Sequence, residues 1–431
     1  MPNSELIRRQ AFLILLVCGI LLTCVGMWLA FSVLRPTPPH TVTMAIDPEG
    51  SFNAEIAQQY REHLARSGIE LKLVPTAGAV ESLSLLNNSN SGVSIAIIPG
   101  GITTQEESPR LISLGALFYE PIWMFSRGQV LEKHEHLRSL RISIGPEGSA
   151  SRAQSLEFLA RVGIFDQKSA TILNFPPQES AQKLMAGETD VAIYVDSWET
   201  PVVQQLLKSP EVNLASMRRA DAFVALYPYL NKLVLPAGVA DLAENRPPAD
   251  VTLLASKASL VVRDDLHPAI QYLLLEAASQ IHSGPGIFRA SGQFPAPESI
   301  DLPLGAHAVQ YYKTGSPFLQ RNLPFWLAIL IQQILVLLIP VAGVLYPLFR
   351  VVPKTFVWFQ RRRVYKVYSE LKLLEEELAA AGRGKTANDF INRLDQLEDH
   401  VSHLWVPPSL RPEIYDLRSH IDLVRVEAQR N

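Results

Sequence analysis

Two stretches of this sequence, Asp47-Pro48-Glu49-Gly50-Ser51 and Gly145-Pro146-Glu147-Gly148-Ser149, share the order Pro-Glu-Gly-Ser. Each follows a short run that is typical of a β-strand, at residues 42–46 and 141–145, and each precedes a helical pattern. The repeat predicts that the chain uses one strand-turn-helix unit twice, at matched positions in two similar halves.

Shorter strand and helix patterns alternate after each of these two units. The further strands are expected at residues 69–74, 93–98, 171–175 and 190–195, and the further helices at residues 78–86, 176–186 and 199–207. Because repeated βαβ units need a mostly parallel sheet with helices on both faces, we predict an α/β domain with two lobes. We assign residues 41–320 to it, with lobe 1 at about 41–130 and 255–320 and lobe 2 at about 138–240.

The two Pro-Glu-Gly-Ser turns are candidates for ligand binding. A turn that opens a helix after a parallel strand presents unpaired backbone N–H groups and the positive end of the helix dipole. Ligands of open α/β sheets bind at the carboxyl ends of the strands, so two such turns facing each other would hold a small anion such as a carboxylate. The alternative is that Ser51 and Ser149 only cap their helices.

The apolar surplus of the chain lies in two segments. The 431 residues are 48% hydrophobic and 19% charged, yet residues 11–34 and 323–349 contain no charged side chain. Each segment exceeds the roughly 20 residues that a membrane-spanning helix needs, so we predict two transmembrane helices. A cleaved signal peptide is the competing reading of the first segment. This composition excludes a disordered chain, a polytopic permease and a free cytosolic enzyme.

The charges that flank the second segment predict its orientation. Six basic residues and no acid lie between Arg350 and Lys366, which marks the cytoplasmic side of a membrane. We therefore expect a two-pass protein of a bacterial inner membrane, with residues 1–10 and 350–431 in the cytoplasm and the two-lobed domain outside. The basic block is also a candidate site for anionic lipid headgroups.

Signatures of catalysis are missing from the sequence. It contains no G-x-S-x-G, Walker or G-x-G-x-x-G motif, and His134-Glu135-His136 lacks the helical spacing of a zinc protease site. The only cysteines, Cys18 and Cys24, both lie in the first apolar segment, so they cannot brace the outer domain. We predict a protein that is not an enzyme, with no catalytic residue, metal or cofactor and no nucleic-acid partner.

A series of motifs resembles one family of solute receptors. The series comprises residues 46–60, Val74-Pro75-Thr76-Ala77-Gly78-Ala79-Val80-Glu81, Leu117-Phe118-Tyr119-Glu120-Pro121-Ile122-Trp123, residues 144–152, Leu235-Pro236-Ala237-Gly238 and residues 258–268. In this order the motifs resemble those of the TAXI receptors, the extracytoplasmic subunits of tripartite ATP-independent periplasmic (TRAP) transporters. The resemblance runs from about residue 41 to 350, and residues 292–321 with the second apolar segment are similar to a membrane-tethered branch of that family.

The resemblance implies a type II periplasmic-binding-protein-like fold that closes on a dicarboxylate or an acidic amino acid and delivers it to a TRAP-type permease. Carried over by position, the implied ligand-binding residues are Gly50, Ser51, Phe52, Thr76, Ala79, Val80, Gly148, Ser149, Ala150, Ser151, Tyr194 and Trp198. Trp198 either stacks on the ligand or packs at the hinge. Arg152 is either a counter-ion for a carboxylate or a solvent-facing residue of the first helical turn.

The tail after the basic block carries three amphipathic patterns. Apolar residues recur at alternating spacings of three and four at residues 364–378, 390–404 and 414–428. They predict an all-α cytoplasmic tail, which either forms a small bundle or coiled coil or offers a docking surface to a permease or a cytoplasmic partner. Because a shuttling receptor does not need such a tail, a sensor or scaffold that passes ligand occupancy inward is the alternative function.

Overall fold

The computed structural model describes residues 38–48, 50–128, 131, 137–164, 170–298, 301–316, 318–319, 323, 325–381, 387–404, 406 and 408–430, with residues 21, 24–26 and 28. It divides the chain into two compact units. Arg35–Gln333 form the first, here called the lobed unit, and Ile334–Asn431 with Met1–Leu34 form the second, here called the helical unit.

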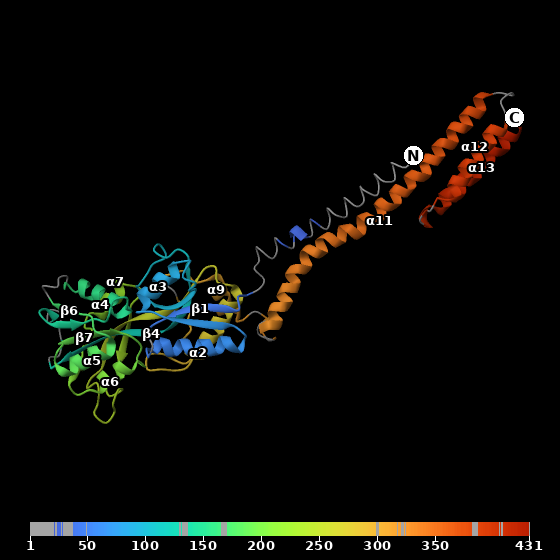
Figure 1. Ribbon diagram of the computed structural model, residues 1–431. Coiled ribbons are helices and arrows are strands. Elements are labelled where there is room, and N and C mark those ends of the chain that lie inside the picture. Colours follow the sequence, from blue (N-terminus) through green and yellow to red (C-terminus); the bar gives the residue numbers. More distant parts are fainter. Residues whose placement is uncertain are drawn as a thin grey trace. The chain divides into compact units, whose positions relative to one another are not determined.

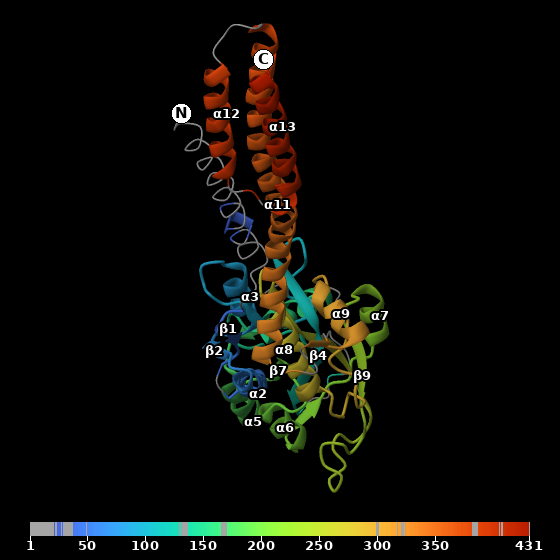
Figure 2. The same cartoon turned by 90° about the vertical axis from the view of Figure 1, so that its right-hand side faces the viewer.

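Lobe 1 of the lobed unit is built on a parallel sheet in which β1 lies between β2 and β3. Its elements are β1 (Thr41–Ile46), α2 (Phe52–Arg66), β2 (Glu70–Pro75), α3 (Ala79–Asn87), β3 (Ile95–Pro99), α8 (Pro268–His282) and α9 (Ala306–Thr314). The helix α2 buries Ile56, Tyr60 and Leu64, which recur every fourth residue and face the lobe 1 core together with residues of α8. The helices α2 and α8 pack side by side (Figure 2).

Lobe 2 repeats the strand-helix alternation around β7, which pairs with β5 and with β4. Its elements are β5 (Arg141–Ser143), α4 (Ala150–Arg161), β6 (Thr171–Leu173), α5 (Pro177–Ala186), β7 (Val191–Val195), α6 (Pro201–Lys208), β8 (Val212–Leu214), α7 (Ala220–Leu226) and β9 (Asn231–Leu235). All five residues of β7 are buried, as expected for an inner strand of a sheet with helices on both faces. Figure 1 shows α4, α5 and α6 gathered around this lobe, apart from α2.

Two long antiparallel strands, β4 (Leu111–Arg127) and β10 (Val251–Arg263), run through both lobes. Residues 111–121 of β4 pair with β10, and residues 122–126 pair with β7 of lobe 2. In the same way β10 pairs with β3 through Ala258–Val262 and with β9 through Val251–Ala255. The lobes are therefore joined by a shared pair of strands, and β4 changes partner between Pro121 and Ile122.

The structure confirms the predicted α/β class and the strand-turn-helix repeat. The strands and helices expected between residues 42 and 207 are present, with ends that differ by up to two residues. Neither β4 nor β10 was among the predicted strands. The segment His134-Glu135-His136 lies outside the described residues.

The two predicted membrane spans are not confirmed. Among the described residues, the structure contains no helix with the length and apolar character needed to cross a bilayer. The first predicted span, residues 11–34, falls almost entirely outside the described residues, and most of the second, residues 323–349, belongs to the helix α11 (Phe325–Ala381).

The helical unit contains the three amphipathic helices that the sequence predicts. They are the last part of α11, α12 (Ala387–Ser402) and α13 (Arg411–Arg430), with a 3₁₀ turn, η2 (Pro408–Leu410), before the last. Val367, Leu394 and Leu417 represent a shared core to which all three helices contribute. The apolar residues at alternating spacing therefore pack in a small helical bundle. This confirms the prediction of a bundle for these apolar positions.

Candidate functional site

The first Gly-Ser turn lies between the carboxyl end of β1 and the amino end of α2. The Ser51 hydroxyl oxygen accepts a hydrogen bond from the backbone N–H of Ala54 at 3.2 Å, which makes Ser51 the N-cap of α2. Gly50 has φ +83°, a conformation that favours glycine, and an added Cβ there would meet no atom within 4 Å. The turn therefore combines a capped helix with an open space beside its glycine.

The second Gly-Ser turn has the same construction in lobe 2. The Ser149 hydroxyl oxygen accepts from the N–H of Arg152 at 3.2 Å, and the hydroxyl donates to the carbonyl oxygen of Pro146 at 2.7 Å. Gly148 has φ +86°, close to the value at Gly50. Both serines are N-caps, which was the alternative to ligand binding expected from the sequence. The two turns that share a sequence also share a backbone conformation.

The two lobes touch at the start of α3 and the second turn. The N–H of Val80 donates to the carbonyl oxygen of Gly148 at 3.1 Å, and an added Cβ on Gly78 would lie 2.7 Å from Cα of Ser149. A second bridge comes from α4, where Nε2 of Gln154 donates to the carbonyl oxygen of Gly100 at 2.8 Å. These contacts join lobe 1 to lobe 2 directly, and we call this arrangement of the lobed unit the closed form.

The remaining predicted site residues of lobe 1 have partners within that lobe. The Thr76 hydroxyl donates to the carbonyl oxygen of Ile46 at 2.9 Å and lies 2.9 Å from the hydroxyl of Ser82. Phe52 packs edge-to-face on Phe118, with ring centroids 5.3 Å apart. Ala79 is buried in a small apolar cluster of lobe 1, under the contact that Val80 makes with lobe 2.

In lobe 2, Ser151 links α4 to β7, because its hydroxyl accepts from the N–H of Val195 at 3.0 Å. Ala150 opens α4, and Arg152 donates from Nη1 to the side-chain oxygen of Asn174 at 2.7 Å.

Two aromatic residues of lobe 2 complete the predicted set. The Tyr194 ring is buried against Phe125, and Trp198 packs against Trp123 and Phe288 with centroids 6.1 Å and 6.3 Å away. Trp198 thus belongs to an aromatic cluster, and its stacking on a ligand stays a proposal.

The structure also brings together three carboxylates that the sequence did not suggest as a group. Asp47 follows β1, Asp196 follows β7, and Glu120 lies in β4 one residue before Pro121, where the strand passes from lobe 1 to lobe 2. Nδ2 of Asn53 lies between two of them, 2.7 Å from Oδ2 of Asp47 and 3.4 Å from Oε1 of Glu120. We call Asp47, Asn53, Glu120 and Asp196 the acidic cluster.

The protein environment disfavours the charged forms of these acids. Burial raises the pKa of Glu120 well above its usual range, and the nearby Asp196 and Asp47 raise it further. Burial also raises the pKa of Asp47, against the effect of the hydrogen bond from Asn53. Burial raises the pKa of Asp196 to about 7, although the Thr200 hydroxyl, 2.5 Å from Oδ1, favours the ionised form. The acids are thus close enough to repel one another when ionised.

Each acid carried a signal that was visible in the sequence. Asp47 and Asp196 directly follow short apolar strands, and Glu120 is the only charged residue within an apolar run of residues 111–126. Burial of a carboxylate at the end of a strand, or inside an apolar strand, costs free energy unless a hydrogen-bond donor or a cation compensates the charge. Among the described residues no group of His, Cys, Asp and Glu side chains has the arrangement of a metal site, the acidic cluster included.

Two cavities elsewhere in the lobed unit do not include these residues. One of about 430 Å³ is lined by residues of lobe 2 and the following loop, among them Leu206, Arg246 and Pro247. Another of about 40 Å³, beside Gly100 and Asp301, has room for about one water molecule. A smaller cavity of about 20 Å³ is lined in part by Trp198. We take the region of the two Gly-Ser turns and the acidic cluster as the candidate site, because residues of both lobes meet there.

Comparison with known proteins gives one family match. A family model described as the NMT1-like family matches residues 52–314. A search of curated proteins finds no match to this sequence.

Several solved structures show partial similarity. The periplasmic aliphatic sulphonate binding protein of Escherichia coli is 12% identical, with 57% of this chain and 69% of that chain covered and a TM-score of 0.35. An arginine-specific periplasmic binding protein of Salmonella typhimurium is 10% identical, with 57% and 95% covered and a TM-score of 0.36. The GluR0 ligand-binding core of Nostoc punctiforme, solved with L-glutamate, is 12% identical, with 56% and 92% covered and a TM-score of 0.36.

Proposed function

Because this chain belongs to the NMT1-like family, we propose that its lobed unit is an extracytoplasmic receptor that closes on a small organic solute. The family model covers most of both lobes, which have a periplasmic-binding-protein-like α/β fold. The observation that carries the proposal is the pair of matched Gly-Ser turns, one in each lobe, beside the backbone contact of Val80 with Gly148. Closure by hinge motion about β4 and β10 would bring these turns together around a ligand.

The turns favour a solute with a carboxylate group. The amino ends of α2 and α4 supply backbone N–H groups and positive dipole ends, and each helix follows the carboxyl end of a strand, β1 or β5. We propose the first-turn residues Gly50 and Ser51, and the second-turn residues Gly148 and Ser149, as the contacts of that carboxylate. The other positions implied by the resemblance are proposed to shape the site around it.

Transport is the proposed role of solute capture. The motif series that resembles TAXI receptors supports a TRAP-type permease as the partner that accepts the solute. The two charge-free segments support attachment to a membrane, and Ile334, Leu335 and Leu338 of α11 expose at least half of their apolar side chains. Partition of the full chain into carbonate-washed membranes would test the attachment, and full recovery in the soluble fraction would contradict it.

Capture of a solute by the closing lobes is tested by measuring the melting temperature of the full chain with and without candidate ligands. A solute that binds only the folded lobes adds about 2.7 kcal/mol at a concentration 100 times its dissociation constant, which raises the melting temperature. We expect at least one compound among amino acids and dicarboxylates to do so, read by the fluorescence of the buried Trp123. No shift with any of them would refute solute capture of this chemical class.

A sensor is the second candidate function, favoured by the packed bundle of the helical unit. Removal of residues 360–431 separates the two functions in cells that carry the permease. Uptake that persists while a transcriptional or metabolic response is lost would support the sensor. Loss of uptake itself would support a tail that assembles with the permease.

A further inference from the structure

We propose that the solute carries a cationic nitrogen and that the acidic cluster is the subsite that holds it, which rests on the proposed function of the lobed unit. The solute would then be an amino acid or another amine-bearing acid, and a plain dicarboxylate would be rejected. Asp47, Glu120 and Asp196 would surround the ammonium group while the Gly-Ser turns hold the carboxylate.

The positions of the three acids fit a subsite that forms on closure. Asp47 comes from lobe 1, Asp196 from lobe 2, and Glu120 from the strand that passes between them. Asp47 is four residues from Ser51 in the chain, and Asp196 directly follows Val195, whose N–H bonds the α4 residue Ser151. The acids therefore lie next to the elements that carry the proposed carboxylate contacts.

Two buried acceptor atoms point to a missing donor. Oε2 of Glu120 and Oδ1 of Asn53 have no hydrogen-bond partner in the part of the chain that the structure describes. The exposed fractions of the two residues are 2% and 8%, so bulk water does not satisfy these atoms. A buried unsatisfied acceptor costs about 1–3 kcal/mol, more when it is charged, and an ammonium group offers three donors.

No cation of the protein fills this role within the described ranges. None of the ion pairs there involves Asp47, Glu120 or Asp196. On the loop after β7, Glu199 does have a partner, because Arg289 lies 3.3 Å from its carboxylate. The hydroxyls of Ser197 and Thr200 face Glu199 and Asp196. In the described ranges the protein thus pairs Glu199 with a cation, whereas Asp47, Glu120 and Asp196 receive hydrogen bonds from neutral groups alone.

The same charges predict how affinity changes with pH. In the closed form, burial raises the pKa of Asp196 to about 7 and also raises the pKa of Asp47, and burial together with the nearby Asp196 and Asp47 raises the pKa of Glu120. A bound ammonium favours the ionised carboxylates, so it lowers these pKa values and releases protons. Affinity should therefore rise as the pH increases from 6 to 8, and a ligand without the cation should not show this rise.

The decisive experiment compares amine-bearing and amine-free probes on the full chain. The probes are the twenty L-amino acids and putrescine against glutarate and succinate, with L-glutamate and glutarate as a pair that differs only in the amino group. We expect the best amine-bearing probe to bind at least tenfold more tightly than either diacid. Equal or tighter binding of glutarate or succinate would overturn the cationic subsite and leave solute capture intact. Absence of binding by every probe would overturn the proposed function and this inference with it.

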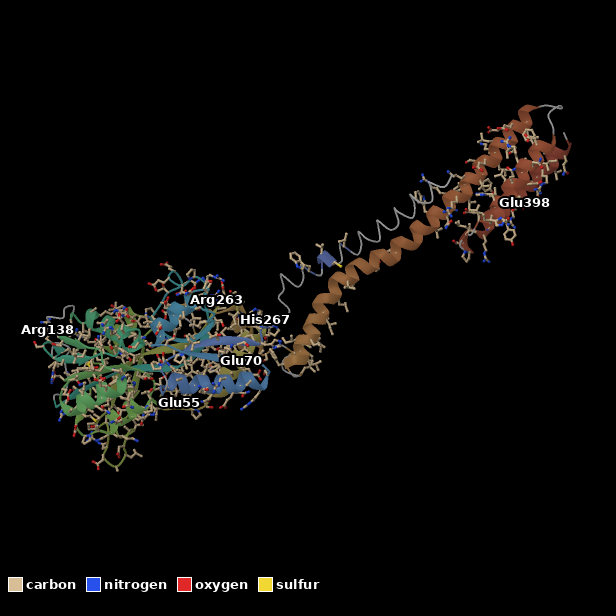
Figure 3. All side chains as sticks on the ribbon, viewed as in Figure 1. Glu55, Glu70, Arg138, Arg263, His267 and Glu398 are labelled. Carbon is tan, nitrogen blue, oxygen red and sulfur yellow. The ribbon has the colours of Figure 1, made fainter. Side chains whose placement is uncertain are left out.

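Charge-neutral variants locate the subsite. Glu120→Gln and Asp196→Asn keep the size of each side chain, and each should weaken the amine-bearing probe at least tenfold. Each variant should melt at the same temperature as the parent or higher when empty, because a buried acid has been replaced by a neutral amide. The matched control is Glu55→Gln, since Glu55 is exposed on α2, the helix that carries Asn53 (Figure 3). Unchanged binding by both cluster variants would overturn the assignment.

Discussion

The contact of the lobes at Gly78 makes closure sensitive to a single methyl group. Gly78 lies directly before α3 with φ +143°, and a Cβ added there would meet Cα of Ser149 at 2.7 Å and the carbonyl oxygen of Gly148 at 3.0 Å. Both neighbours are backbone atoms of the opposite lobe, so they cannot rotate away. We therefore predict that Gly78→Ala disfavours the closed form.

The magnitude follows from these distances. Ordinary van der Waals contact begins at 3.4 Å, so the lobes must separate by about 0.7 Å at this point. The same movement would lengthen the 3.1 Å hydrogen bond between Val80 and Gly148 to about 3.8 Å, beyond hydrogen-bonding distance. Overpacking of this kind costs about 1–3 kcal/mol, which corresponds to a loss of about 5–150-fold in apparent affinity when only the closed form binds.

The assay is the dissociation constant of the best amine-bearing probe, measured by calorimetry on the full chain. Gly68→Ala is the matched control, because Gly68 has φ +76° and an added Cβ there would meet nothing within 4 Å. Both variants place an alanine at a positive φ, but only Gly78→Ala blocks the lobe contact. Equal affinities of the two variants would refute the reasoning.

Three further predictions concern stability. Burial lowers the pKa of His282 to about 3, so the contribution of its neutral ring to stability is complete above about pH 6.5 and falls by about 1.4 kcal/mol per pH unit below that. The difference in unfolding free energy between the parent and His282→Gln should change accordingly between pH 7 and pH 5 in urea titrations. Identical slopes for the two proteins would contradict this. Leu274→Ala, in the fully buried face of α8, should cost about 2–5 kcal/mol in the same titration, and a loss below about 1 kcal/mol would show that the lobe 1 core tolerates the cavity. Leu417→Asp should expose the bundle of the helical unit to protease while the lobed unit stays resistant; simultaneous cleavage of both would contradict their independence.

The local elements of the lobed unit were predictable because their signals are short-range. Alternating strand and helix patterns, and the turns that end in Ser51 and Ser149, depend on residues within one or two helical turns. The long strand β4 was missed because residues 111–126 are apolar almost throughout, and a strand buried on both faces lacks the alternation that distinguishes it from a buried helix.

The acidic cluster could not be predicted as a unit for a different reason. Glu120 lies 73 residues after Asp47 and 76 before Asp196, so only the pairing of β4 with both lobes brings the three together. The Gly-Ser turns at the amino ends of α2 and α4 suggested an anionic ligand. That inference used the helix ends alone and took no account of the acids. Of the two ligand classes expected from the sequence, a dicarboxylate and an acidic amino acid, the acids favour the one that carries both charges.

The change of strand partner in β4 has a consequence for the empty protein. Because Glu120 lies at the pivot while Asp47 and Asp196 belong to opposite lobes, separation of the lobes increases the distance between like charges and admits water to them. The ionised empty form therefore has a lower electrostatic energy when it is open, and a bound cation reverses this preference. If the transport partner binds only the closed form, few empty receptors would bind it. The charges of the three acids would thus reduce unproductive binding of empty receptors to the permease.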